Sequence, residues 1–200
     1  MELIIIRHGE SEADLLGVHE GRADFSLTEQ GREQAEKMAA YIAEKWKPDI
    51  ILASTLKRAW ETAQFLQKAT GCELVAEPDL MEYNNGVLAG LSREVAATKY
   101  PLPPGGRPPH IPIEGGESEL EFRYRAEAVL QKILHEHPVE GRIAIVSHGG
   151  MISKLINAFL GISALNETIF PTGDTGFHVL EIKNGRKMVR ILNCQIHLVS

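Results

Sequence analysis

The stretch Leu3-Ile4-Ile5-Ile6, followed at once by Arg7-His8-Gly9, decides how the rest of the chain is interpreted. A continuous apolar run rich in β-branched residues is typical of a strand buried on both faces, as in a parallel sheet between helices. Comparable runs occur at 49–53 and 142–146, and a helical pattern follows each run. This order predicts an α/β fold: a three-layer sandwich with a mostly parallel central sheet covered by helices.

Four helices and a late hairpin are predicted around these strands. The first helix starts after the capping signal Ser26-Leu27-Thr28-Glu29 and ends before Lys47-Pro48. The other helices are expected at about 55–68, at about 119–136, and from Gly149 onward. The strands predicted at 177–182 and 188–192 flank Asn184-Gly185, a strong signal for a hairpin turn.

The length of 200 residues suits one compact domain. Residues 100–112 contain six prolines and two glycines, so regular structure is not expected there. The patterns on both sides of this stretch continue the same α/β arrangement. We therefore predict a single domain, 1–200, in which residues 83–118 form an irregular lid or rim over the C-terminal ends of the strands.

Composition and charge argue against several classes of protein. The formal net charge of −6 argues against a nucleic-acid binder but leaves room for a local positive pocket. No stretch reaches the roughly 18 apolar residues of a membrane span, so we expect no membrane partner and a cytoplasmic protein. Only Cys72 and Cys194 are present, and their separation indicates reduced thiols. The sequence leaves open whether the chain is a monomer or a homodimer.

Two histidines directly follow predicted strands. His8 comes after the first strand and His148 after the strand at 142–146, and each is followed by glycine. Ligands of open α/β sheets bind at the carboxyl ends of the strands, where helix N-termini also attract anions. Arg7 and Arg58 are expected at the same edge, where their guanidinium groups can bind phosphate oxygens.

The ordered set of such segments resembles the histidine phosphatase superfamily, which includes phosphoglycerate-mutase-like phosphatases. The similarity extends over nearly the whole chain. The matching segments are Arg7-His8-Gly9-Glu10-Ser11, Gly21-Arg22-Ala23-Asp24, Leu27-Thr28-Glu29-Gln30-Gly31, Ser54-Thr55-Leu56-Lys57-Arg58-Ala59, Leu80-Met81-Glu82, Gly115-Gly116-Glu117-Ser118 and Ser147-His148-Gly149-Gly150.

The resemblance implies a phosphomonoesterase that acts on a small phosphorylated metabolite and requires neither a metal nor another cofactor. By resemblance, His8 attacks phosphorus in line and carries a phosphohistidine intermediate, and Glu82 is the general acid and base. The implied catalytic residues are Arg7, His8, Arg58, Glu82 and His148. The implied phosphate- or substrate-binding residues are Arg7, Ser11, Asp14, Gly21, Arg58, Glu82, His148 and Gly149.

The chemistry of these side chains agrees with the implied roles. Phosphoryl transfer mainly requires positioning and stabilisation of the equatorial oxygens, which arginines, an imidazolium and a helix N-terminus can supply. We expect His8 to be neutral, with its second ring nitrogen hydrogen-bonded, and His148 to be protonated. We also expect a nearby phosphate dianion to raise the pKa of Glu82.

Three positions depart from the family pattern. Asp14 stands where many relatives have asparagine, Glu20 replaces a small polar residue, and Asn85 stands where mutases tend to have tyrosine. Phosphate repels a carboxylate unless the carboxylate pairs with an arginine or takes a proton. The roles of Asp14 and Glu20 are therefore left open.

Two alternative functions compete with a phosphatase. A cofactor-dependent phosphoglycerate mutase is expected, by resemblance, to carry a basic insertion after Glu82. Here that stretch holds Arg93, Lys99 and Arg107 among prolines, without paired arginines, which favours the phosphatase. A non-catalytic phosphate-binding module predicts loss of one of the key residues, and His8, Arg58 and His148 are all present.

Overall fold

The computed structural model describes residues 1–138, 140–165 and 168–199. In this part of the chain, six strands form one sheet in the order β3-β2-β4-β1-β5-β6. Their bounds are β1 (Glu2–Arg7), β2 (Ile50–Ala53), β3 (Glu73–Ala76), β4 (Arg142–Ser147), β5 (Phe177–Lys183) and β6 (Arg186–Cys194). The first four are mutually parallel, whereas β5 and β6 are antiparallel to their neighbours.

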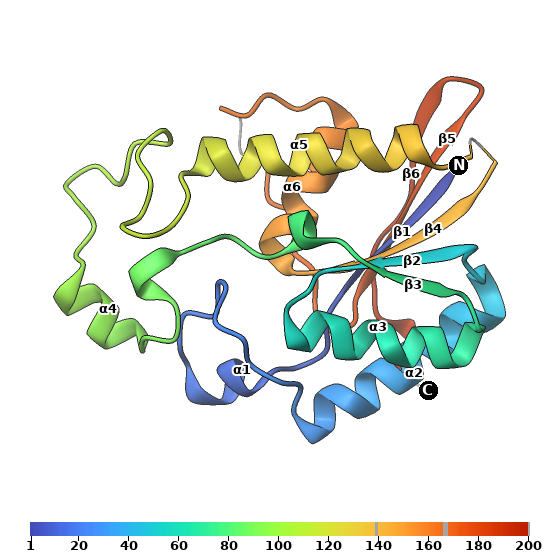
Figure 1. The fold of residues 1–200 in the computed structure, drawn as a ribbon, viewed down its shortest axis with the longest axis horizontal. Coiled ribbons are helices and arrows are strands. Elements are labelled where there is room, and N and C mark those ends of the chain that lie inside the picture. Colours follow the sequence, from blue (N-terminus) through green and yellow to red (C-terminus); the bar gives the residue numbers. More distant parts are fainter. Residues whose placement is uncertain (139, 166–167, 200) are drawn as a thin grey trace.

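Helices cover both faces of the sheet. The helices are α1 (Glu12–Leu16), α2 (Glu29–Trp46), α3 (Lys57–Thr70), α4 (Arg93–Lys99), α5 (Glu119–Glu136) and α6 (Gly149–Leu160). Figure 1 shows α5 and α6 on one face and α2 and α3 on the other. Two apolar cores lie between these layers, one against each face of the sheet. The predicted three-layer α/β fold with a mostly parallel sheet is confirmed.

The sequence explains where the central elements begin and end. All four side chains of Leu3–Ile6 are fully buried, as the continuous apolar run predicted. The Thr28 hydroxyl accepts a hydrogen bond from Gly31 N at the start of α2, and Ser118 forms a capping box with Glu121 at the start of α5. In the hairpin turn, Asn184 and Gly185 both have positive φ, as the turn signal required.

The sequence did not predict β3, α1 or α4. The strand β3 lies at the edge of the sheet, and none of its four side chains is buried, so it lacks the apolar run of a central strand. The helix α3 begins at Lys57, two residues later than expected, because Leu56 keeps an extended backbone. Residues 100–112 contain no helix or strand, as predicted.

The segment 83–118 lies beyond the carboxyl ends of the parallel strands (Figure 1). It contains a short 3-10 helix, Gly86–Leu88, and the helix α4. His19 N donates to Leu91 O at 2.8 Å, and Gly90 N donates to His19 O at 2.7 Å, so this segment is attached to the loop after α1. The division into one domain with a rim at 83–118 stays a prediction.

Candidate active site

The carboxyl ends of β1 and β4 bring the two predicted histidines together. These strands pair in parallel with Arg7 opposite Ser147, so His8 and His148 leave the sheet side by side. Their ring centroids are 5.1 Å apart, and both side chains are buried. Arg58 enters from the start of α3, which follows the neighbouring strand β2.

His8 is held in one tautomer. Its Nδ1 lies 2.7 Å from Gly9 O, and a carbonyl can only accept, so Nδ1 carries the proton. The lone pair is therefore on Nε2. Burial, followed by the charges of Arg58 and Arg7, holds the pKa of His8 well below 6.5. The ring is neutral at ordinary pH, and Nε2 can act as a nucleophile.

Arg58 is fully buried and binds the loop after α1. Its Nη1 donates to Ala23 O at 2.9 Å and its Nη2 donates to Gly21 O at 2.8 Å. Its Nε lies 3.2 Å from His8 Nε2 and 3.1 Å from Glu20 Oε1. The guanidinium is therefore fixed from behind, with Nε–H directed at the nucleophilic nitrogen.

Arg7 is oriented from the loop before β5. Its Nη1 donates to Thr172 O at 2.8 Å, and its Nη2 lies 3.2 Å from Asp174 Oδ1. Its Nε is buried and has no hydrogen-bond partner among the described residues. A Cβ added to Gly149 would lie 3.9 Å from this Nε, so the unsatisfied donor is beside the start of α6. A buried donor without a partner costs about 1–3 kcal/mol, a cost that a bound anion removes.

His148 presents a second unsatisfied ring nitrogen. Its Nε2 lies 2.8 Å from Ser54 Oγ, whose proton has no other acceptor in the described part of the chain. Ser54 thus donates to Nε2 and leaves the ring proton on Nδ1, which is buried and lacks a partner among the described residues. Burial, then the charges of Arg58, His8 and Arg7, lower the pKa of His148 well below 6.5. The expected imidazolium stays a prediction, and the neutral ring is already a donor through Nδ1.

Glu82 lies at the N-terminus of α6. Its carboxylate accepts hydrogen bonds from the backbone N–H groups of Tyr83 at 2.8 Å, Gly150 at 2.9 Å and Met151 at 3.2 Å. A Cβ at position 150 would come within 2.5 Å of Glu82 Oε1, so this close approach requires glycine. The carboxylate is thus held at the end of the helix where anions are stabilised.

Arg125 of α5 fixes the segment that carries Glu82. Its guanidinium donates to the carbonyl oxygens of Asp79, Met81 and Glu82 at 2.8, 2.7 and 3.1 Å. It also binds Glu117 Oε1 at 2.6 Å, and Glu117 in turn accepts from Asn84 N at 2.7 Å. Arg125 therefore holds the chain on both sides of Glu82 in place.

Ser11, Asp14 and Glu20 form an acidic group next to the histidines. Ser11 N and Ser11 Oγ donate to Asp14 Oδ2 at 2.9 and 3.1 Å, which places Asp14 at the start of α1. Ser11 Oγ also lies 2.5 Å from Glu20 Oε1, and Glu20 Oε2 lies 3.7 Å from His8 Nε2. The Ser11 hydroxyl has one proton, shared between two carboxylates. The predicted phosphate-binding roles of Ser11 and Asp14 stay predictions, and Glu20 is the carboxylate nearest the nucleophile.

Gly21 has a φ of +48°, and a Cβ there would collide with the Asn85 side chain. Its carbonyl oxygen is the acceptor for Arg58 described above, so the position needs glycine to keep that carbonyl in place. Gly149 is the first residue of α6. Its backbone lies at the helix end that faces Arg7, where free N–H groups can bind an anion.

Four further residues orient the site and were not predicted from the sequence: Ser54, Arg125, Thr172 and Asp174. Thr172 and Asp174 precede β5, which is antiparallel to β1. An antiparallel strand brings its beginning, not its end, to the edge where parallel strands finish. The cluster Pro171-Thr172-Gly173-Asp174 before the hairpin was the available signal, but the sequence does not fix the direction of β5.

The site thus contains the neutral nucleophilic nitrogen of His8, the buried guanidinium of Arg58, the buried Nε of Arg7 and an imidazole N–H of His148. These groups lie beside the N-terminus of α6. The two unsatisfied donors, Arg7 Nε and His148 Nδ1, are in position to bind oxygens of an anion. Such donors fit a phosphoryl group. In the described part of the chain, no helix has the length and apolar character needed to cross a membrane.

Comparison with known proteins identifies the class. The model of the histidine phosphatase superfamily (branch 1) matches residues 3–195, and the chain belongs to this family. The chain is accordingly an enzyme of the phosphoric monoester hydrolase type.

Individual relatives have different names. The chain is 28% identical to "Phosphoserine phosphatase 1" of Hydrogenobacter thermophilus over 99% of this chain and 94% of that protein. It is 35% identical to "Probable phosphoglycerate mutase GpmB" of Photorhabdus laumondii over 82% of this chain and 77% of that protein. The crystal structure of the α-ribazole phosphatase from Shigella flexneri superposes with a TM-score of 0.80 at 26% identity, covering 98% of this chain and 97% of that chain.

Proposed function

We propose that this protein hydrolyses small phosphomonoesters by transferring the phosphoryl group to Nε2 of His8. One observation carries the proposal: the Gly9 carbonyl fixes the proton of His8 on Nδ1, so that a neutral Nε2 faces the Arg58 guanidinium. The unsatisfied donors Arg7 Nε and His148 Nδ1 supply further ligands for the equatorial oxygens.

The reaction proceeds in two steps. In the first, Glu82 takes a proton as the substrate dianion binds beside it, the lone pair of His8 Nε2 bonds to phosphorus, the P–O ester bond breaks, and Glu82 gives its proton to the leaving oxygen. In the second, the Glu82 carboxylate takes a proton from water, the water oxygen bonds to phosphorus, and the N–P bond breaks. Inorganic phosphate leaves, and both side chains return to their initial protonation states.

Positive charge in the site supports a mechanism that needs neither metal nor cofactor. Arg58, Arg7 and the N-terminus of α6 can together neutralise the charge on the transferred group. The relatives named for phosphoserine and α-ribazole support a small phosphorylated metabolite as the substrate. A mutase remains the alternative, because the relative at 35% identity carries that name.

The test is turnover of phenyl phosphate in the presence of a metal chelator. We expect His8→Ala to lower kcat by about a thousandfold or more and Glu82→Gln by about 100- to 10,000-fold. The matched control is His135→Ala, which removes an exposed histidine of α5 and is expected to change nothing. Wild-type-like turnover by His8→Ala contradicts the covalent mechanism. Interconversion of phosphoglycerates faster than phosphate release favours the mutase.

A further inference from the structure

A loop before β5 sets the direction of the Arg7 side chain. Residues 172–176, which we call the Arg7 loop, contact Arg7 at three points. The carbonyl oxygen of Thr172 accepts from Arg7 Nη1 at 2.8 Å, and Asp174 Oδ1 lies 3.2 Å from Arg7 Nη2. The carbonyl oxygen of Gly176 accepts from the backbone N–H of Arg7 at 3.0 Å. Because the loop holds both terminal nitrogens of the guanidinium, it decides where Nε points, the nitrogen that lacks a partner among the described residues.

The backbone of the Arg7 loop is strained at Thr175. This residue is fully buried and has a φ of +52°, in the left-handed region that a β-branched residue rarely adopts. Such a conformation costs about 1–3 kcal/mol and persists only where the surrounding structure holds it. The backbone N–H of Thr175 donates to the carbonyl oxygen of His8 at 3.1 Å, so the strained residue contacts the main chain of the nucleophile. Other parts of the chain must therefore impose the shape of this loop.

His178 of β5 holds the start of the Arg7 loop. Its ring is buried, and its Nδ1 accepts from the backbone N–H of Asn193 at 3.2 Å. The ring proton is therefore on Nε2, which donates to Thr172 Oγ1 at 2.9 Å. Asn193 Oδ1 also accepts from the backbone N–H of Gly173 at 2.9 Å. His178 and Asn193 thus fix two successive residues of the loop from β5 and β6.

His197 holds the middle of the Arg7 loop in a similar way. This buried histidine lies in the 3-10 helix Ile196–Leu198, which follows β6. The Thr175 hydroxyl donates to the carbonyl oxygen of Asp174 at 2.7 Å, so its oxygen accepts from His197 Nε2, which lies 2.9 Å away. Two imidazole rings therefore restrain the strained loop.

Both rings are neutral at ordinary pH. Burial lowers the pKa of His178 to about 4, and burial together with the charge of Lys37 lowers the pKa of His197 to about 4. A neutral imidazole has one donor and one acceptor nitrogen, which is the arrangement that the contacts of His178 require. The two rings therefore support the loop as hydrogen-bonding groups and add no charge to the phosphate site.

A single residue, Thr172, connects His178 to Arg7. Thr172 accepts from His178 through its hydroxyl and from Arg7 through its carbonyl oxygen. We propose that His178 is a positioning residue for the phosphate site: it holds Thr172 where the carbonyl keeps Arg7 Nε directed at the bound phosphoryl group. This role rests on the proposed function of His8, because that function puts a phosphoryl group beside Arg7. His178 acts through Arg7 and not on the substrate.

Variants of His178 and Thr172 test this connection. His178→Leu removes the donor, whereas His178→Gln keeps an amide N–H that can reach Thr172. Thr172→Val removes only the accepting hydroxyl and leaves the carbonyl that binds Arg7. We expect His178→Leu and Thr172→Val to bind inorganic phosphate about tenfold more weakly than wild type, as loss of one buried hydrogen bond predicts, and His178→Gln to bind it within about threefold. Isothermal titration measures these affinities without turnover.

The matched control is Thr70→Val. It removes a buried hydroxyl that donates to Leu66 O at 2.7 Å, at the end of α3 and about 18 Å along that helix from Arg58. We expect this variant to lower the melting temperature without changing the phosphate affinity. A loss of affinity in Thr70→Val as large as in Thr172→Val would show that any weakening of the fold produces the effect, and it overturns the proposal.

Removal of Arg7 separates positioning from a general loss of stability. If His178 acts through Arg7, His178→Leu lowers kcat/KM for phenyl phosphate about tenfold in wild type but less than about twofold in an Arg7→Ala background. An equal loss in both backgrounds overturns the proposal, because the guanidinium is then not involved.

The two proposals fail in different ways. Phosphate binding that depends on His178 and Arg7, in a protein without phosphatase activity that depends on His8, refutes the proposed function and keeps the positioning role. Phosphatase activity that depends on His8, with wild-type phosphate affinity in Thr172→Val, refutes the positioning role alone. Thr172→Val decides this even where His178→Leu does not fold, because valine has nearly the shape of threonine.

Discussion

Glu20→Gln is expected to tighten phosphate binding at neutral pH. The Glu20 carboxylate lies 3.1 Å from Arg58 Nε and 3.7 Å from His8 Nε2, where an oxygen of the substrate has to bind. A phosphate dianion that binds there must therefore displace the Glu20 carboxylate from Arg58. Glutamine keeps the size of the side chain and removes the competing charge.

The expected gain in affinity follows from the strength of the interaction between Arg58 and Glu20. A hydrogen bond between charged groups contributes about 1.5–3 kcal/mol, and the substrate recovers part of that when Glu20 no longer competes. At about 1.4 kcal/mol for each factor of ten, phosphate or vanadate should bind Glu20→Gln roughly tenfold more tightly than wild type. Glu12→Gln makes the same change of formal charge on the exposed face of α1 and is the matched control.

The effect should depend on pH in a defined direction. Burial, with a smaller contribution from Asp14, raises the pKa of Glu20 above 4.5, against the opposing effects of Arg58 and Ser11. As the pH falls through that raised pKa, Glu20 takes a proton and stops competing. The ratio of wild-type to variant affinity should therefore approach one in acid and depart from one at neutral pH. Because the ionisation of phosphate affects the wild type and the variant equally, it cancels in this ratio.

Isothermal titration of inorganic phosphate at several pH values between about 4.5 and 8 measures this ratio. Weaker binding by Glu20→Gln at neutral pH would show that the carboxylate organises Arg58 rather than competing for it. A ratio that does not vary with pH would refute the protonation argument. Equal gains in phosphate affinity in Glu20→Gln and Glu12→Gln would show that the effect comes from the change in net charge alone.

Three other changes test the groups that orient the site. Ser54→Ala removes the donor to His148 Nε2 and should lower kcat/KM about tenfold with little change in the folded structure, as steady-state kinetics and circular dichroism can check. Arg125→Gln releases the carbonyls next to Glu82 and should lower kcat more than it raises KM, whereas an equal effect on both would argue against positioning. Burial lowers the pKa of His178 to about 4, so stability from its neutral form is present above about pH 6.5 and lost as the pH falls toward 4, by at most about 3 kcal/mol. Urea unfolding at pH 7 and pH 5 measures the part of this loss that falls between those two values, about 2 kcal/mol, which His178→Gln should reduce.

The sequence predicted the elements whose patterns are strong and local. The strand β1 is recognisable because burial on both faces requires a continuous run of apolar residues. The starts of α2 and α5 are recognisable because the free N–H groups of a first turn favour a capping hydroxyl. His8 and His148 were predicted as neighbours because the ends of parallel strands meet at one edge. These inferences needed no knowledge of long-range contacts.

The parts that were missed depend on long-range contacts. The helix α4 has seven residues and one buried side chain, Ala96, so it carries almost no periodic signal. Arg125 acts on Glu82 from 43 positions away. The cavity of about 470 Å³ beside α4 likewise depends on the path of an irregular chain, which local residue preferences do not determine.

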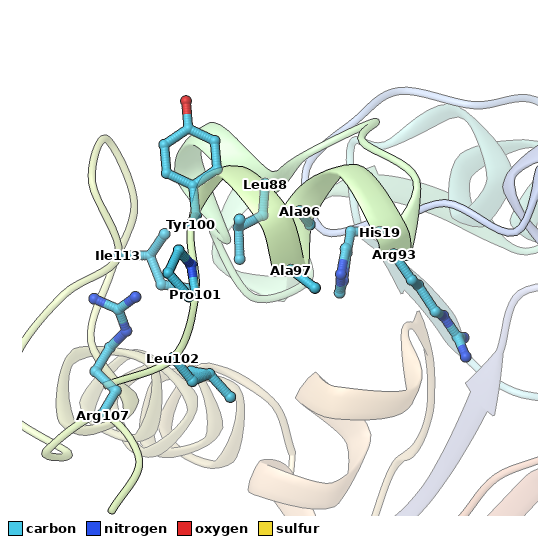
Figure 2. Close-up of a pocket in the computed structure, with 10 residues that line it drawn as sticks. All are labelled: His19, Leu88, Arg93, Ala96, Ala97, Tyr100, Pro101, Leu102, Arg107 and Ile113. Carbon is cyan, nitrogen blue, oxygen red and sulfur yellow. The ribbon is translucent and has the colours of Figure 1, made fainter. Parts of the chain in front are cut away.

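The separation between the strand ends and the rim has an evolutionary consequence. The reactive histidines are fixed by the register of β1 and β4, whereas the cavity of about 470 Å³ beside α4 is lined, apart from His19, by residues of one continuous stretch, 88–113 (Figure 2). Substitutions, insertions or deletions in that stretch can change the shape of this cavity without altering the pairing that holds His8 beside His148. This cavity can therefore change in the course of evolution while the reactive pair at the strand ends stays the same.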